Sequence, residues 1–456
     1  MRRHPGVALW LIGCLAALCR AAERPPADLV GDLERLGYEN IALESDDSTL
    51  SVWCENRRVR YPPAWMVEAL VLAAERVPPE TRVRLVAEKL ARPIVSLSAR
   101  AGDVREWIDG RMPSSEFRRR LTIRFAGSAS PPERRNASVR RFDLVLGPGR
   151  MLSQFGLPGS YVRLHVDVGA ELVTALRPGL AAYGRAFIPI GNRGGAVGGD
   201  SRYYELRPGS MLVSYGRAFG SSAFSTLTAG MFELGNRLYD SYGLSLDARK
   251  YSPGGHWSVG GQVSYVGFAA YTIDDDLVGR RRIWRFSWPP ARWPYQAVAS
   301  YRVDGVDLQI VGRWGRFLGG DRGWRVDIAR KFGELGVTIF GIGSDGRFAG
   351  ASRVDPKDTK LLGGVQFELP LYPGSRGMPD RFRVTSASSF TWAYRYRIGN
   401  VGVDVATKYQ VEDLIAQYNP VVIGNNLDRV RVWVRRAGVQ AEHARGGMEA
   451  SASGGH

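Results

Sequence analysis

Apolar and polar side chains alternate with a period of two along successive segments between about positions 160 and 434. In residues 401–411, for example, valine and tyrosine at odd positions alternate with Asp404, Lys408 and Gln410. Glycine, proline, asparagine and aspartate separate the segments and mark turns. The pattern predicts antiparallel strands of a transmembrane β-barrel, with one face toward lipid and the other toward a wet lumen. A generous count gives about 12 to 16 strands.

A soluble, exported β-sandwich or β-helical protein is the alternative fold, because its strands alternate as well. The apolar faces here are rich in tyrosine, tryptophan, valine and leucine over many successive segments. Exposing so much apolar surface to water would favour aggregation, so the membrane barrel is the preferred interpretation. One segment fits poorly, since Arg217 falls on the apolar face of residues 211–219.

The first residues resemble a secretory signal peptide. Arg2 and Arg3 precede a mostly apolar stretch, Val7–Leu18, and small residues follow at Ala21 and Ala22. Residues 11–14 also resemble a lipoprotein signal, in which Cys14 would be acylated. No other stretch reaches the roughly eighteen consecutive apolar residues of a membrane-spanning helix, so a membrane location implies strands.

Residues between the signal and the alternating region have a different pattern of apolar positions. A helical apolar pattern at Ala64–Val77 lies among short extended stretches, which predicts a small α/β domain. A segment with two prolines and four arginines then forms the natural linker. The predicted order is signal peptide, periplasmic α/β domain, linker, outer-membrane barrel and flexible tail, at residues 1–21, 22–126, 127–140, 141–436 and 437–456.

The chain is strongly basic, with a formal charge of +17 that becomes +14 when Arg2, Arg3 and Arg20 leave with the signal. Such a charge favours an acidic partner. An exported protein rarely meets nucleic acid, so an acidic polysaccharide and the phosphates of lipopolysaccharide are the expected partners. Removal of the signal leaves Cys54 as the one cysteine, so no internal disulfide is expected.

The polar faces of the predicted strands carry cations that could offer an acidic glycan a weakly attractive, hydrated path. Aspartates fall on the same inferred faces, so pairing across strands is the competing structural interpretation of each arginine. The candidate lumen-facing residues are Arg163, Arg249, Arg302, Arg313, Arg325, Arg395, Arg397 and Lys408.

Enzyme signatures are weak along the whole chain. Gly341–Gly346 matches a dinucleotide fingerprint in its letters, but no helix pattern follows it, which favours a hairpin turn. His165, His256 and His443 lie far apart without ligand-spaced companions, so no metal site is expected. No nucleophile elbow is present either. The sequence therefore favours a non-enzymatic protein without a cofactor.

Three blocks carry a resemblance to a known family: Glu55–Tyr61, Leu206–Gly209 with Ala229–Leu234, and Gly363–Leu371. Together they resemble the YjbH-like exopolysaccharide proteins. The resemblance implies an outer-membrane barrel of a Gram-negative bacterium that assists export or assembly of exopolysaccharide or capsule, together with other export proteins. A general outer-membrane porin and a soluble periplasmic polysaccharide-modifying enzyme are the two rival functions.

Overall fold

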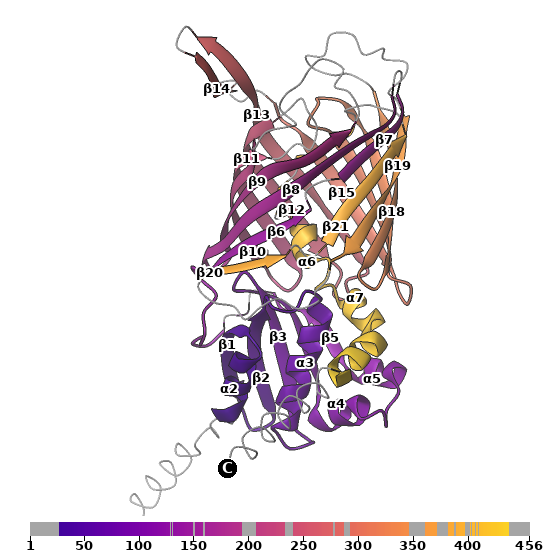
Figure 1. The fold of residues 1–456 in the computed structure, drawn as a ribbon. Helices are drawn as coiled ribbons and strands as arrows, with labels where there is room; N and C mark the ends of the chain where they lie inside the picture. The colour runs from indigo at the N-terminus through magenta and orange to yellow at the C-terminus, as the bar shows by residue number, and fades with distance from the viewer. Residues whose placement is uncertain are drawn as a thin grey trace, which may run out of the picture.

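The computed structural model describes part of the chain and shows a mainly β protein (Figure 1). It describes residues 27–436 except 128, 130, 149–150, 158–159, 194–206, 233–239, 277–278, 287–291, 346–360, 372–381, 387–388, 397–401, 403, 406 and 409. The signal-peptide prediction, the acylation prediction for Cys14 and the predicted tail 437–456 lie outside these residues. Two sheets and a C-terminal helical segment make up the described fold.

The first sheet and its helices form a unit, called here the α/β unit, with strand order β1-β2-β3-β4-β5. The β2–β3 pair is parallel and the other pairs are antiparallel. Its elements are α2 (Ala27–Arg35), β1 (Tyr38–Ser45), β2 (Thr49–Asn56), α3 (Pro62–Glu75), β3 (Arg82–Lys89), β4 (Arg92–Arg100), α4 (Ala101–Ile108), α5 (Ser114–Arg120) and β5 (Thr122–Phe125).

Helix α3 is the crossover between the parallel strands β2 and β3 and corresponds to the helix predicted at 64–77. Prolines occupy its first turn, where a missing N–H costs nothing. Its buried side chains cover most of its circumference, as expected of a helix enclosed on several sides. Trp65 of this helix contacts the rings of Tyr38 in β1 and of Tyr418 in the C-terminal segment, so both parts of the chain cover it.

The second sheet contains 16 strands. Its strands are β6 (Phe142–Pro148), β7 (Met151–Leu157), β8 (Ser160–Arg177), β9 (Leu180–Arg193), β10 (Arg207–Phe219), β11 (Ala223–Phe232), β12 (Asp240–Tyr251), β13 (Trp257–Asp276), β14 (Gly279–Phe286), β15 (Tyr295–Val303), β16 (Leu308–Arg316), β17 (Arg322–Phe332), β18 (Leu335–Ser344), β19 (Leu361–Pro370), β20 (Phe382–Ser386) and β21 (Ser389–Tyr396).

Most neighbouring strands of this sheet are consecutive in sequence and antiparallel, as the alternation predicts. Two long strands pair with three neighbours each along different parts of their length: β8 with β6, β7 and β9, and β13 with β12, β14 and β15. Strand β7 pairs in parallel with β21 through Met151 and Trp392, and β20 pairs in parallel with β6. The first and last strands of the sheet are therefore neighbours in space (Figure 1).

The two faces of the sheet differ sharply in chemistry. In β15, Tyr301 is 52 % exposed while the adjacent Ser300 and Arg302 are buried. In β16, Trp314 is 65 % exposed, although it is among the largest apolar side chains. On the buried face small polar groups bond to each other, as between the hydroxyls of Ser258 and Ser300 at 2.7 Å. The apolar face thus points outward, and the polar face points into the curve of the sheet.

The prediction that residues 401–436 complete the sheet is wrong. The described residues among 402–410 form no strand, and α6 (Val411–Ile415), α7 (Pro420–Asn425) and helical residues 427–436 follow. The segment alternates as a strand would, but β21 already pairs with β7, so no strand edge is available there for another partner. Its polar groups bond to the inner face instead, and α7 and the residues after it lie beside the α/β unit (Figure 1).

Part of the predicted linker contacts the α/β unit. Arg135 forms a bridge with Ile41 of β1, and the Ser138 backbone N–H donates to the side chain of Asn40 at 2.9 Å. These contacts attach the linker to the α/β unit, so this part of it is not a free spacer. None of the helices in the described ranges has the length and apolar character needed to cross a bilayer.

Candidate functional site

The described residues among 402–415, called here the inner segment, lie against the polar face of the large sheet at the end nearest the α/β unit (Figure 1). Its backbone is bound by strand side chains: Gln262 donates to the carbonyl of Val405 at 3.0 Å, and the N–H of Val411 donates to Asp247 at 2.8 Å. Each contact satisfies a backbone group that has no strand partner. The inner segment is therefore held by specific hydrogen bonds.

Glu412 on α6 is the most highly connected side chain of the inner segment. Its carboxylate accepts hydrogen bonds from Arg302 at 2.6 Å, Gln309 at 2.7 Å, Tyr251 at 3.0 Å and Arg249 at 3.2 Å. Burial by itself would raise the pKa of Glu412, but Arg302 and Arg249 outweigh burial and lower the pKa to about 2. Glu412 is thus a carboxylate that joins α6 to strands β12, β15 and β16.

Asp404, near the start of the inner segment, makes a second set of contacts. Gln296 donates to its carboxylate at 2.6 Å, while Arg325 and Arg313 lie at 3.7 Å and 3.9 Å. Both arginines also pair with Asp327 of β17. The acidic groups of the inner segment therefore neutralise much of the positive charge on the sheet's polar face.

Five of the eight predicted lumen-facing cations can be placed from these contacts. Arg249 and Arg302 bind Glu412, Arg313 and Arg325 bind Asp327, and Lys408 pairs with Glu171 at 2.9 Å. Lys408 lies on the inner segment, so its predicted position on a strand is wrong. The side chains of Arg163 and Arg395, and all of Arg397, lie outside the described residues. At the described positions, pairing with carboxylates takes up the charge.

Arg313 and Arg325 pair with Asp327 and Asp404, aspartates that the alternation places on the same polar faces, as the competing structural interpretation expects. Glu412 was not predicted as a partner of Arg249 and Arg302. The sequence contains one weak signal against a strand here. Asn419 and Pro420 are a residue pair typical of a helix start, and they follow shortly after Glu412 and Asp413. Asn419 does cap α7, accepting the N–H of Val421 at 2.9 Å. A helix start inside the supposed last strand would have argued against a strand there.

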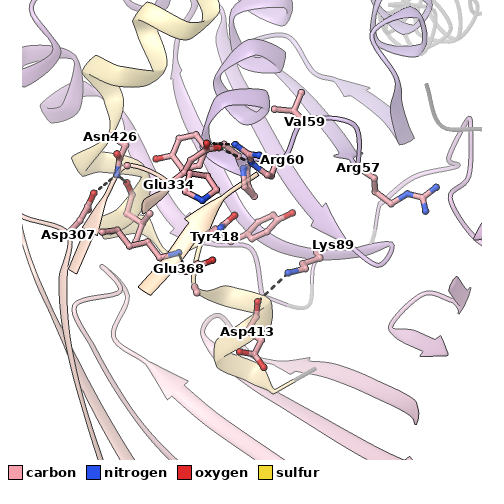
Figure 2. A pocket seen from close by; sticks show the side chains of 18 of the residues that line it. Arg57, Val59, Arg60, Lys89, Asp307, Glu334, Glu368, Asp413, Tyr418 and Asn426 are labelled. Carbon is pink, nitrogen blue, oxygen red and sulfur yellow. Dashed lines mark hydrogen bonds and ion pairs between the residues drawn. The ribbon is translucent and has the colours of Figure 1, made fainter. Parts of the chain in front are cut away.

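A cavity of about 520 Å³ lies between the α/β unit, the inner segment and the turns of the large sheet (Figure 2). Lys89 at the end of β3 donates to the backbone carbonyl of Asp413 at 3.3 Å, and burial lowers the pKa of Lys89 to about 8. Burial raises the pKa of Asp413 to about 6. Opposite them, Asn426 donates to Asp307 at 2.7 Å. The cavity is lined by charges of both signs that already have partners nearby.

The two walls of this cavity are joined by ion pairs between the α/β unit and the sheet. Arg60 binds Glu334 in the β17–β18 turn (Figure 2). Arg57 donates to Asp143 of β6 at 2.8 Å, and Asp143 also accepts from Arg383 of β20 at 3.0 Å. These contacts fix the α/β unit at the end of the sheet where the inner segment lies.

Replacing Asn419 with alanine is expected to lower the free energy of unfolding by about 1–2 kcal/mol, because the helix cap and the bond from Asn419 to the carbonyl of Gly255 at 3.0 Å are both lost. Asn419→Ser keeps a capping oxygen but lacks the amide donor, so an intermediate loss is expected. Denaturant titration of the purified protein measures both. Equal stability of Asn419→Ala and the parent would contradict the capping role.

Among the described residues, no group of three or more His, Cys, Asp or Glu side chains is arranged to hold a metal ion. A search of curated proteins and a search of solved structures gave no match. The model of the YjbH family, described as exopolysaccharide biosynthesis protein YbjH, matches residues 17–341. The match covers the α/β unit and most of the large sheet, and it ends before the inner segment. The chain therefore belongs to the YjbH family of exopolysaccharide biosynthesis proteins.

Proposed function

We propose that the protein is a non-enzymatic outer-membrane β-barrel that assists export or assembly of an exopolysaccharide, with its α/β unit in the periplasm. Family membership supplies the link to exopolysaccharide. The observation that carries the membrane role is the outward apolar face around a polar interior. Water would not tolerate so continuous an apolar surface, whereas a bilayer requires one.

Strand β17 gives a measure of the proposed membrane thickness. Its outward positions between Arg322 and Arg330 are Trp324, Val326 and Ile328, all exposed. Eight residues span about 26 Å along a strand, or about 20 Å when the strand is tilted by about 40°. This is close to the apolar band of roughly 25 Å on outer-membrane barrels. Basic residues thus fall where lipid head groups would begin.

Pairing of β8 with both β7 and β9 supports closure of the sheet into a barrel. A spanning sheet must close, because backbone groups at an open edge would meet hydrocarbon without a hydrogen-bond partner. The inner segment then acts as a plug at the periplasmic end of the lumen. An interior occupied by bonded residues such as Glu412 favours a gated export or assembly component over a freely conducting porin.

Cell fractionation with a polysaccharide assay tests this proposal. The full chain produced in a Gram-negative host is expected in the outer membrane, resistant to carbonate extraction, and to migrate differently on gels before and after boiling. Deletion of the gene in its native host is expected to reduce surface exopolysaccharide. Release by carbonate would refute the barrel, whereas unchanged exopolysaccharide would refute the export role.

A further inference from the structure

Several strands of the large sheet end their outward faces with a basic residue at the end nearest the α/β unit. Arg177, Arg217, Lys250 and Arg330 occupy these positions on β8, β10, β12 and β17, and all four are exposed. Among the described residues none of the four pairs with a carboxylate. The arrangement accounts for Arg217, which the alternation alone leaves as a misfit.

Aromatic rings lie beside the three arginines of this set. The Arg217 guanidinium lies 5.4 Å from the ring of Phe219, that of Arg177 lies 5.9 Å from Tyr215, and that of Arg330 lies 4.6 Å from Phe332. Cation–π contact holds a guanidinium near the surface while leaving its N–H groups available. Basic and aromatic side chains together are typical of the level where a membrane protein meets head groups.

Arg217 and Lys250 lie on the two strands that flank β11. Ser225 lies directly opposite Arg217, and Ala223 lies directly opposite Lys250, so only small side chains separate the two cations. Two strand spacings place the backbones of β10 and β12 about 10 Å apart, within which both long side chains can reach one phosphate. Ser225 offers an additional hydroxyl, because its neighbours Phe224 and Thr226 are buried on the inner face.

We propose that Arg217, Lys250 and Ser225 form a binding site for the head group of an anionic phospholipid. The inference rests on the proposed membrane-spanning role. The phosphodiester accepts hydrogen bonds from Arg217, which can bind two oxygens at once, and from Lys250. The acyl chains lie along Leu227 and Leu246, which are exposed on the same face further from the α/β unit. The site faces the leaflet on the side of the α/β unit.

Binding of the full-length protein to lipid nanodiscs tests the site. The parent is expected to prefer phosphatidylglycerol over phosphatidylcholine. The double variant Arg217→Gln/Lys250→Gln is expected to lose about tenfold of that preference, because it removes the general charge effect of two basic residues and also the hydrogen bonds that both cations donate to one phosphodiester. The matched control is Arg316→Gln/Arg322→Gln, which removes two cross-strand arginines at the opposite end of β16 and β17. The control also removes two basic residues at a head-group level, so it is expected to lose only the smaller part of the preference that general charge provides.

The outcomes separate this site from the proposed function. Equal loss in both double variants would overturn the site in favour of a general charge effect, as would retention of the preference in Arg217→Gln/Lys250→Gln. Stronger binding of lipopolysaccharide than of phosphatidylglycerol by the parent would also overturn it. Failure of the parent to insert into any nanodisc would instead count against the membrane role. Insertion with no lipid preference would remove the head-group site alone.

Discussion

Glu412→Ala is expected to raise the ionic conductance of the protein in planar bilayers at least tenfold over the parent. Four side chains from three strands bind this one carboxylate. Its removal leaves Arg302 buried without its carboxylate and Arg249 with Asp247 alone, at 3.4 Å. Breaking a buried ion pair from one side costs about 3–5 kcal/mol when the inner segment is in place. Since 1.4 kcal/mol is about a factor of ten, the balance between the closed and open segment would shift by roughly a hundredfold or more.

The pH dependence of the closed state follows from the same group. The pKa of Glu412 is lowered to about 2 in the folded protein, mainly because Arg302 and Arg249 overcome the effect of burial. A carboxyl whose folded pKa lies below its unfolded value stabilises the fold above the unfolded pKa of about 4.3, and the contribution disappears as the pH falls toward the folded pKa. The parent is therefore expected to stay closed at pH 5 and to conduct only in stronger acid.

Asp413→Ala is the matched control for Glu412→Ala. It removes one carboxyl from the neighbouring residue of α6 and keeps the backbone carbonyl that Lys89 binds. Conductance close to that of the parent is expected. Circular dichroism establishes that each variant keeps its β content. A closed Glu412→Ala protein with intact β structure would show that the inner segment is held by other contacts.

Local patterns predicted much of the fold. The helical spacing at 64–77 depends on neighbours in sequence, and α3 is there. Period-two alternation likewise predicted consecutive antiparallel strands such as β15, β16 and β17. These features are encoded within a few residues of each other, because a turn and the two segments beside it specify a hairpin.

What the sequence did not predict depends on contacts between distant residues. An alternating segment becomes a strand only where a sheet edge is available, and the parallel pairing of β21 with β7 occupies the edge that residues 401–411 would need. Alternation cannot reveal that pairing. Glu412 was missed as a partner of the buried arginines for the same reason, since Arg249 and Glu412 are 163 residues apart. Arginines on a polar face indicate that carboxylate partners are required, but the pattern does not identify those carboxylates.

Asp143→Ala is expected to loosen the α/β unit from the large sheet. Asp143 has an exposed side-chain fraction of 8 %, and it binds Arg57 of the α/β unit and Arg383 of β20. Arg57 keeps its two bonds to Glu39, at 2.5 Å and 2.8 Å, but Arg383 loses its carboxylate. Breaking a buried ion pair from one side costs about 3–5 kcal/mol, so faster proteolysis between the two parts is expected.

Asp304→Ala is the matched control for Asp143→Ala, because Asp304 of the large sheet's turn also pairs with an arginine of the α/β unit, Arg118 of α5. Its side chain is 52 % exposed, against 8 % for Asp143, so water already solvates the pair. An exposed pair contributes about 0.2–1 kcal/mol, and proteolysis at nearly the parental rate is expected. Digestion of the three proteins in parallel, followed by mass spectrometry of the fragments, measures the difference. The two sites differ most clearly in burial. Equal proteolysis rates for Asp143→Ala and Asp304→Ala would therefore show that the buried Arg57–Asp143–Arg383 contacts do not hold the α/β unit in place.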